Sequence, residues 1–210
     1  MREHGRRASH SEGQDGLSTS VVATKFRYWA ASRIPSPPLE ERVRERRPFH
    51  HTSPAVVIRG WGSSNDANHM TGPSRDGAGL ALAIRSALNS AHLKPEDIDW
   101  VNAHGTATPY NDAMEFQALR NVFGGSCPPF NGFKGMVGHT LGAAGVLETI
   151  LCALAMKEGL LPGTPRLKIH AEGAPASLVQ VPRSAPRLDH ILKLNVGFGG
   201  INGALILGHG

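Results

Sequence analysis

The chain has 210 residues, of which 40% are hydrophobic, and carries a formal net charge of +5 at pH 7. This composition allows one domain with a hydrophobic core, and the absence of any run of about 18 apolar residues argues against a membrane span. Only two cysteines occur, Cys127 and Cys152, which excludes a disulfide framework and is typical of a reducing compartment, so we expect a cytoplasmic protein.

Residues 1–54 differ in composition from the rest of the chain. They hold ten Lys or Arg against six Asp or Glu, several prolines and few apolar side chains. Low hydrophobicity with interspersed charge predicts a disordered basic arm, followed by one folded domain at residues 55–210. A binding function of this arm on an acidic surface remains an alternative, through four arginines: Arg42, Arg44, Arg46 and Arg47.

Beta-like and helix-like runs alternate in residues 55–210. The apolar spacing predicts strands at residues 56–62, 97–103 and 130–134, and helices at residues 75–92, 111–123 and 141–157. The second helix is expected to take Asn111 or Asp112 as its N-terminal cap. Three more strands are expected at residues 177–181, 192–196 and 204–207. This order predicts an α/β layer structure with a mixed sheet.

A first candidate site residue is His104, which stands where a predicted strand ends and before a predicted helix. In open α/β sheets, ligands bind at the carboxyl ends of strands. Thr106 and Thr108 follow two residues apart on an extended stretch, so that both hydroxyls lie on one face and could hydrogen-bond an amide-bearing substrate arm. An ordinary surface histidine is the alternative for this motif taken alone.

A second histidine, His139, immediately precedes the long predicted helix. The positive end of the helix dipole favours a neutral imidazole there, which can donate an N–H to a carbonyl oxygen that gains negative charge. Lys134 lies five residues earlier, and either Glu115 or Glu148 could answer its charge. Solvated side chains are the alternative for these three residues, and Asp112 could be either a helix cap or a site residue.

The last motif places three glycines around Phe198 between two predicted strands. This is more glycine than a hairpin needs, which indicates backbone N–H groups turned toward a ligand with Phe198 as an apolar flap. A mobile glycine turn explains the motif equally well. No zinc-type spacing and no Walker-type loop occurs, and the basic residues of this region are scattered, so neither a metal nor a nucleic acid is expected.

The stretches His-Gly-Thr-Ala-Thr-Pro (104–109), Lys-Gly-Met-Val-Gly-His (134–139) and Gly-Phe-Gly-Gly-Ile-Asn (197–202) occur in this order. Together with Trp61–Thr71, they resemble the C-terminal half of a β-ketoacyl-(acyl-carrier-protein) synthase of the Cys-His-His type, over residues 55–207. The resemblance implies one αβα half of a thiolase-like fold. It also implies decarboxylative Claisen condensation of malonyl with acyl thioesters, in fatty acid or polyketide synthesis.

The resemblance assigns a role to each candidate residue. His104 and His139 would polarise the malonyl thioester carbonyl, and Lys134, answered by Glu115 or Glu148, would hold His139 in place. The expected substrate-binding residues are Thr106 and Thr108 on the pantetheine arm, Phe198 and Gly199 at the gate of the acyl pocket with a backbone N–H in an oxyanion hole, and Asn202, which would brace that loop.

The resemblance also implies the partners. No cofactor of the chain's own is expected, because 4′-phosphopantetheine arrives on the acyl carrier protein. Cys127 precedes a proline and Cys152 lies within a predicted helix, so neither matches the family's nucleophile, which belongs to the N-terminal half. We therefore expect a homodimer or a second synthase subunit that supplies the missing half. The alternative is a non-catalytic partner similar to a chain-length factor, or an inactive fragment.

Overall fold

The computed structural model describes residues 56–164 and 166–210. The expectations for residues 1–54, namely the disordered arm, its arginines and the domain boundary, lie outside the described residues. Among the described helices, none is both long and apolar enough to cross a membrane.

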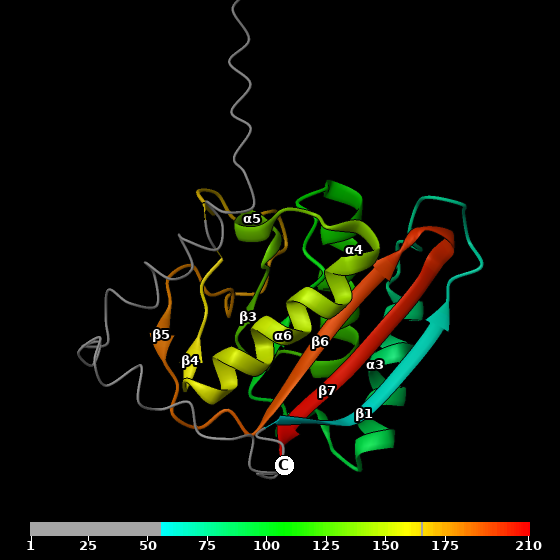
Figure 1. The fold of residues 1–210 in the computed structure, drawn as a ribbon. Helices are drawn as coiled ribbons and strands as arrows, with labels where there is room; N and C mark the ends of the chain where they lie inside the picture. Colours follow the sequence, from blue (N-terminus) through cyan, green and yellow to red (C-terminus); the bar gives the residue numbers. More distant parts are fainter. Residues whose placement is uncertain (1–55, 165) are drawn as a thin grey trace, which may run out of the picture. The chain divides into compact units, whose positions relative to one another are not determined.

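A five-stranded mixed sheet forms the centre of the structure, with the strand order β1-β7-β6-β2-β3 (Figure 1). The strands are β1 (Val56–Asn65), β7 (Ile201–His209), β6 (His190–Gly197), β2 (Trp100–Asn102) and β3 (Phe130–Asn131). Strand β2 runs parallel to both β3 and β6, whereas β7 is antiparallel to both β1 and β6. The prediction of a mixed α/β sheet is confirmed.

Helices cover both faces of this sheet (Figure 1). Helices α3 (Ala78–Ala91) and α4 (Pro109–Phe123) pack on one face, and α6 (Ala144–Lys157) packs on the other. Side chains alternate along β6, so that Leu192 and Leu194 join the α3–α4 core while Ile191 joins the α6 core. Each of these side chains therefore belongs to one of two hydrophobic cores. A shift of one residue in strand pairing would move every side chain to the wrong face, so the two cores fix the register of the sheet.

Helix α6 leaves an apolar face uncovered by the described residues. Leu141, just before the helix, and four of its side chains, Val146, Leu147, Ile150 and Leu154, are exposed to solvent. The opposite side of the helix buries Glu148, Cys152 and Met156 against the sheet. A helix that is apolar nearly all round therefore uses only part of its circumference within this layer.

Some predicted elements differ from the observed ones. The strand predicted at 130–134 is only Phe130–Asn131, and Lys134 instead begins the short helix α5 (Lys134–Val137). Residues 177–181 form no strand, because Pro175 and Pro182 flank them and only Leu178 makes an isolated bridge to Phe130. The short strands β4 (Leu160–Leu161) and β5 (Arg183–Ser184), which pair with each other, were not predicted.

Helix α4 starts earlier than predicted, at Pro109, with Thr108 as the N-cap residue. Proline is favoured at this first position because its missing N–H would have no helical partner. Asn111 and Asp112 thus lie inside the first turn, and the expectation that one of them caps the helix is wrong. The helix is nearly one turn closer to His104 as a result.

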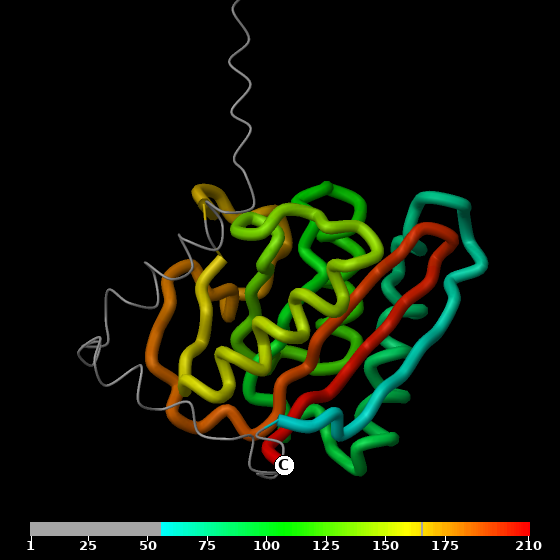
Figure 2. The backbone as a smooth tube through the Cα atoms, in the orientation of Figure 1, coloured from blue at the N-terminus to red at the C-terminus, as the bar shows by residue number. Residues whose placement is uncertain are grey.

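The three parallel strands β2, β3 and β6 end at the same edge of the sheet (Figure 2). His104 follows β2, α5 follows β3, and Phe198 follows β6. Strand parallelism therefore delivers three segments that are far apart in sequence to one edge, which is where ligands bind in open α/β sheets.

Candidate functional site

The His104 loop is held by a buried carboxylate from α4. The backbone N–H groups of His104 and Gly105 both donate to Glu115, each at 2.7 Å, and Asn111 Nδ2 donates to the same carboxylate at 2.9 Å. Burial raises the pKa of Glu115, and the two backbone N–H groups oppose this rise. Glu115 therefore fixes the backbone beside His104 and forms no ion pair with Lys134.

Lys134 contacts His104 rather than His139. Its Nζ lies 3.3 Å from His104 Nδ1, donates to the backbone carbonyl of His104, and forms an ion pair with Glu148 Oε1 at 2.8 Å. The sequence left the partner of Lys134 open between Glu115 and Glu148, and the structure identifies Glu148. The expectation that Lys134 holds His139 is not matched by its contacts, because α5 directs Nζ toward the loop after β2.

The two histidine rings face each other edge to face. Their centroids are 5.5 Å apart and their planes meet at 83°. His104 is 6% exposed, whereas His139 is exposed and accepts the Leu141 N–H on its Nδ1 at 3.2 Å. Gly138, with a φ of 79°, makes the turn that carries His139 from α5 back toward His104. The residues that the sequence selected at positions 104 and 139 thus lie together.

The hydrogen bonds of both rings assign the same tautomer. Nδ1 of His104 faces the Lys134 ammonium and Nδ1 of His139 faces a backbone N–H, so each Nδ1 accepts and the ring proton lies on Nε2. Burial, together with the charges of Lys134, Lys193 and His139, lowers the pKa of His104 to about 3. His104 is therefore neutral at pH 7 and donates through Nε2–H, a suitable donor for an oxyanion.

The sequence reading missed Lys193, a fully buried cation on β6. Its Nζ pairs with the second carboxylate oxygen of Glu148, Oε2, at 2.7 Å. A lysine between apolar neighbours, Leu192 and Leu194, was the available signal, because such a position buries a charge that must find a partner. Glu148 therefore stands between two lysines, not one.

The loop after β6 is fastened to the loop after β1. Gly199 donates its N–H to the Met70 carbonyl at 2.7 Å, and Asn202 Nδ2 donates to the Gly200 carbonyl at 3.1 Å and to Asp66 Oδ1 at 2.7 Å. Gly199 and Gly200 have φ values of 77° and 73°, which favours glycine at both positions. Phe198 is 77% exposed at the tip of this loop. Asp66, the bracing partner of Asn202, was missed.

Thr106 and Thr108 lie close together on the loop after His104, although the stretch is not extended as predicted, because Ala107 between them has a φ of 59°. Their hydroxyl oxygens are 2.9 Å apart, and both remain accessible to solvent. Cys152 is fully buried, and burial raises the pKa of its thiol to about 12, so it is not a nucleophile at neutral pH. Within residues 56–164 and 166–210, no cluster of His, Cys, Asp or Glu is arranged to hold a metal.

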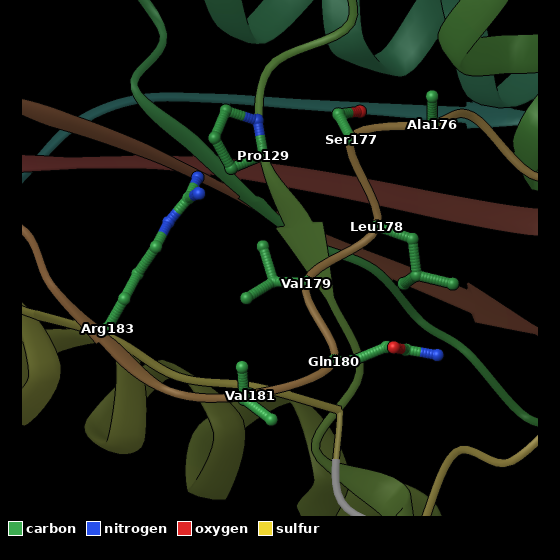
Figure 3. Close-up of a pocket in the computed structure, with 8 residues that line it drawn as sticks. All are labelled: Pro129, Ala176, Ser177, Leu178, Val179, Gln180, Val181 and Arg183. Atoms are coloured by element: carbon green, nitrogen blue, oxygen red, sulfur yellow. The ribbon is translucent and has the colours of Figure 1, made fainter.

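The pocket shown in Figure 3 has neither histidine in its lining. It is lined by Pro129, just before β3, by residues 176–181 and by Arg183. Pro129 precedes the amino end of β3, whereas His104 and Lys134 follow the carboxyl ends of β2 and β3. The candidate site is therefore the histidine pair at the carboxyl edge.

Comparisons with known proteins agree with this geometry. Residues 55–168 match the family model described as the C-terminal domain of beta-ketoacyl synthase. The 3-oxoacyl-[acyl-carrier-protein] synthase 2 of Coxiella burnetii is 38% identical over 169 residues, covering 80% of this chain and 41% of that protein. The putative polyketide beta-ketoacyl synthase 1 of Streptomyces virginiae is 40% identical over 173 residues, covering 80% and 40%.

Solved structures of similar sequence have the same fold. A beta-ketoacyl synthase from Burkholderia phymatum is 35% identical with a TM-score of 0.70, over 74% of this chain and 38% of that one. A type II polyketide ketosynthase in complex with its acyl-carrier protein is 30% identical with a TM-score of 0.71, over 74% and 39%. The described fold is thus one αβα half of a thiolase-like structure.

The chain spans about two fifths of the length of the curated relatives it matches. The matching part contains both histidines, Lys134 and Glu148, which the structure brings together. The chain belongs to the β-ketoacyl synthase family, whose C-terminal domain it carries.

Proposed function

We propose that this chain supplies the two-histidine half of a 3-oxoacyl-[acyl-carrier-protein] synthase, which joins malonyl and acyl thioesters by decarboxylative Claisen condensation in fatty acid or polyketide synthesis. The observation that carries the proposal is the pair of imidazole rings, His104 and His139, whose centroids lie 5.5 Å apart at the carboxyl edge of the sheet. The names of the relatives support the reaction class.

The chemistry follows from the two Nε2–H donors. Both would hydrogen-bond the carbonyl oxygen of a malonyl thioester, where negative charge builds as the bond between Cα and the free carboxylate breaks and CO₂ leaves. The electron pair of that bond forms an enolate held by the two imidazoles. Its Cα then attacks an acyl thioester, forming the carbon–carbon bond, and the thiolate of the acylated cysteine leaves.

His104 and His139 need a supporting group that keeps them neutral and oriented. The Lys134 ammonium donates toward His104 Nδ1, which holds the proton on Nε2 and polarises the ring as a donor. Glu148 holds Lys134 in this position. Thr106 and Thr108 present two accessible hydroxyls beside His104, and these would bind the amide groups of a pantetheine arm.

The proposed partners follow from the same reaction. An acyl carrier protein would deliver malonyl on its phosphopantetheine, so that the chain needs no cofactor of its own, and one structural relative is described in complex with such a carrier. A cysteine-bearing half would accept the acyl group and would come from a second synthase subunit, because a second copy of this sequence offers only Cys127 and the buried Cys152. The exposed side chains of α6, among them Ile150 and Leu154, support association with another protein layer.

Reconstitution tests the proposal. The chain would be co-expressed with the cysteine-bearing N-terminal half of the Coxiella burnetii relative, and CO₂ release from malonyl-loaded carrier protein would be measured. We expect decarboxylation to fall by about 10²–10³-fold in His104→Ala and in His139→Ala, the range for the loss of one oxyanion donor. His209→Ala, at the opposite end of the sheet, is the matched control and should retain activity.

Two outcomes would overturn this function. One is a complex that forms but releases no CO₂, which would favour the alternative of a non-catalytic partner similar to a chain-length factor. The other is an active complex in which His104→Ala is as fast as the unchanged chain.

A further inference from the structure

A row of buried polar side chains crosses the sheet beneath α6. Lys193 on β6 is the register partner of Asn102 on β2, which is in turn the partner of Asn131 on β3. Lys193 is 1% exposed, and the two asparagines are fully buried. Three adjacent strands therefore place a polar side chain, instead of an apolar one, at the same register position of the buried sheet face. This face is covered by the helix that carries Glu148.

Three oxygens surround the Lys193 ammonium. Its Nζ donates to Asn195 Oδ1 at 2.7 Å and to the Leu194 carbonyl, and it forms an ion pair with Glu148 Oε2 at 2.7 Å. Two hydrogen-bond acceptors and one carboxylate oxygen suit a protonated lysine. The site is therefore built for the charged form of this side chain, although burial lowers its pKa and Glu148 opposes that effect.

Glu148 divides its two oxygens between two lysines. Oε1 faces Lys134, which itself touches His104, and Oε2 faces Lys193. Without Lys193, Lys134 would face two carboxylates, Glu148 and Glu115, and the group would carry one net negative charge, whereas with Lys193 the four charges balance. Removing a net negative charge close to the histidines favours the formation of an oxyanion there.

We propose that Lys193 is a positioning residue of the histidine site: it binds the Glu148 oxygen that Lys134 does not contact, so that Glu148 holds Lys134 against His104, and it supplies the positive charge that balances the second carboxylate near the histidines. This inference rests on the proposed function. Lys193 acts through Glu148 and Lys134, because its own polar contacts are with Leu194, Asn195 and Glu148.

The charged and titratable groups around His104 come from every packed element. They are Lys134 on α5, His139 after α5, Glu148 on α6, Glu115 on α4 and Lys193 on β6. Of these, Lys134 and Lys193 both lower the pKa of His104. Removing the Lys193 charge should therefore raise the pKa of His104, with the other four groups left in place.

The test is an NMR titration of the His104 ring in the full chain, labelled at histidine Cε1. In Lys193→Met the pKa of His104 should rise by about one pH unit, the order expected for the loss of a nearby unit charge that lowers this pKa. Lys193→Arg, which keeps the charge, should leave the titration of His104 near that of the unchanged chain. Lys193→Gln keeps a hydrogen-bond donor for Glu148 and serves if the Met variant does not fold.

The reconstituted enzyme provides the second readout. In Lys193→Met and Lys193→Gln, kcat for malonyl decarboxylation should fall about tenfold or more with little change in KM, and the acid limb of the pH profile should move upward. A folded neutral variant whose His104 titrates as in the unchanged chain would overturn the inference. If the unchanged chain releases no CO₂, the proposed function fails, while the titration still decides the role of Lys193.

Discussion

Acid should destabilise this chain in part through one ring, His104. Burial first, and then the charges of Lys134, Lys193 and His139, lower the pKa of His104 from 6.5 to about 3. In the unfolded chain the same ring titrates near its ordinary value. As the pH falls, the unfolded state therefore binds this proton first, and the folded state loses stability. The contribution is fully present above the unfolded pKa and disappears as the pH approaches the folded one.

The magnitude follows from the two pKa values. Each unit of difference corresponds to about 1.36 kcal/mol, so the whole window is worth about 5 kcal/mol, and lowering the pH to about 4.5 removes about 2.7 kcal/mol. His104→Gln keeps an acceptor for Lys134 but carries no titrating ring. Relative to the unchanged chain, this variant should therefore gain about 2.7 kcal/mol in unfolding free energy between about pH 7.5 and about pH 4.5.

Urea unfolding at the two pH values measures this difference. Other groups titrate in the same range, but they are common to both proteins and cancel in the comparison. His209→Gln, which changes an exposed histidine at the far end of β7, is the control and should follow the unchanged chain. If the stability difference between His104→Gln and the unchanged chain is the same at both pH values to within about 0.5 kcal/mol, the depressed pKa of His104 is refuted.

Three further predictions concern the frame of the site. Glu115→Ala should lower the unfolding free energy by about 3 kcal/mol in urea melts, because it strands two backbone N–H groups that cost about 1–3 kcal/mol each; a loss under about 0.5 kcal/mol would contradict the geometry. Gly79→Ala should cost about 1–3 kcal/mol in thermal unfolding, since a Cβ there would lie 1.9 Å from Asp66 Oδ1; a melting temperature equal to that of the unchanged chain would be incompatible with this contact. Ile150→Glu should reduce concentration-dependent association in sedimentation experiments, because it places a charge on the exposed apolar face of α6. Leu82→Glu on α3 is the control and should not reduce association. Equal effects of both variants would contradict association through the exposed face of α6.

The mixed sheet and the convergence of both histidines could be predicted because local patterns determine them. Each histidine follows a strand-like run and precedes a glycine or a helix, and parallel strands bring such positions to one edge. The order of the three motifs then identified the family. Helix α6 could be predicted from its apolar spacing, and its uncovered apolar face is consistent with one half of a layered fold.

Pairings across the fold could not be predicted in the same way. Glu115 and Glu148 were equal candidates for Lys134, because spacing along the chain does not say which helix faces which side of the sheet; α4 and α6 lie on opposite faces. Lys193 stands in an otherwise apolar strand, and its role could not be predicted without knowing that Glu148 on α6 is its ion-pair partner. The cap of α4 was missed because the alternating Thr and Ala residues before Pro109 resemble a continuing extended segment.

The position of β7 has a consequence for how the protein is made. This strand, the last along the chain, lies between β1 and β6 and is the hydrogen-bonded neighbour of both. During synthesis β1 emerges well before β7, so it must wait until residues 66–200 have been made before its neighbour leaves the ribosome. Contacts this distant in sequence slow folding and prolong the time in which nascent strands can pair wrongly. Assistance by a chaperone would therefore matter more for this protein than for a chain whose first strands pair with each other.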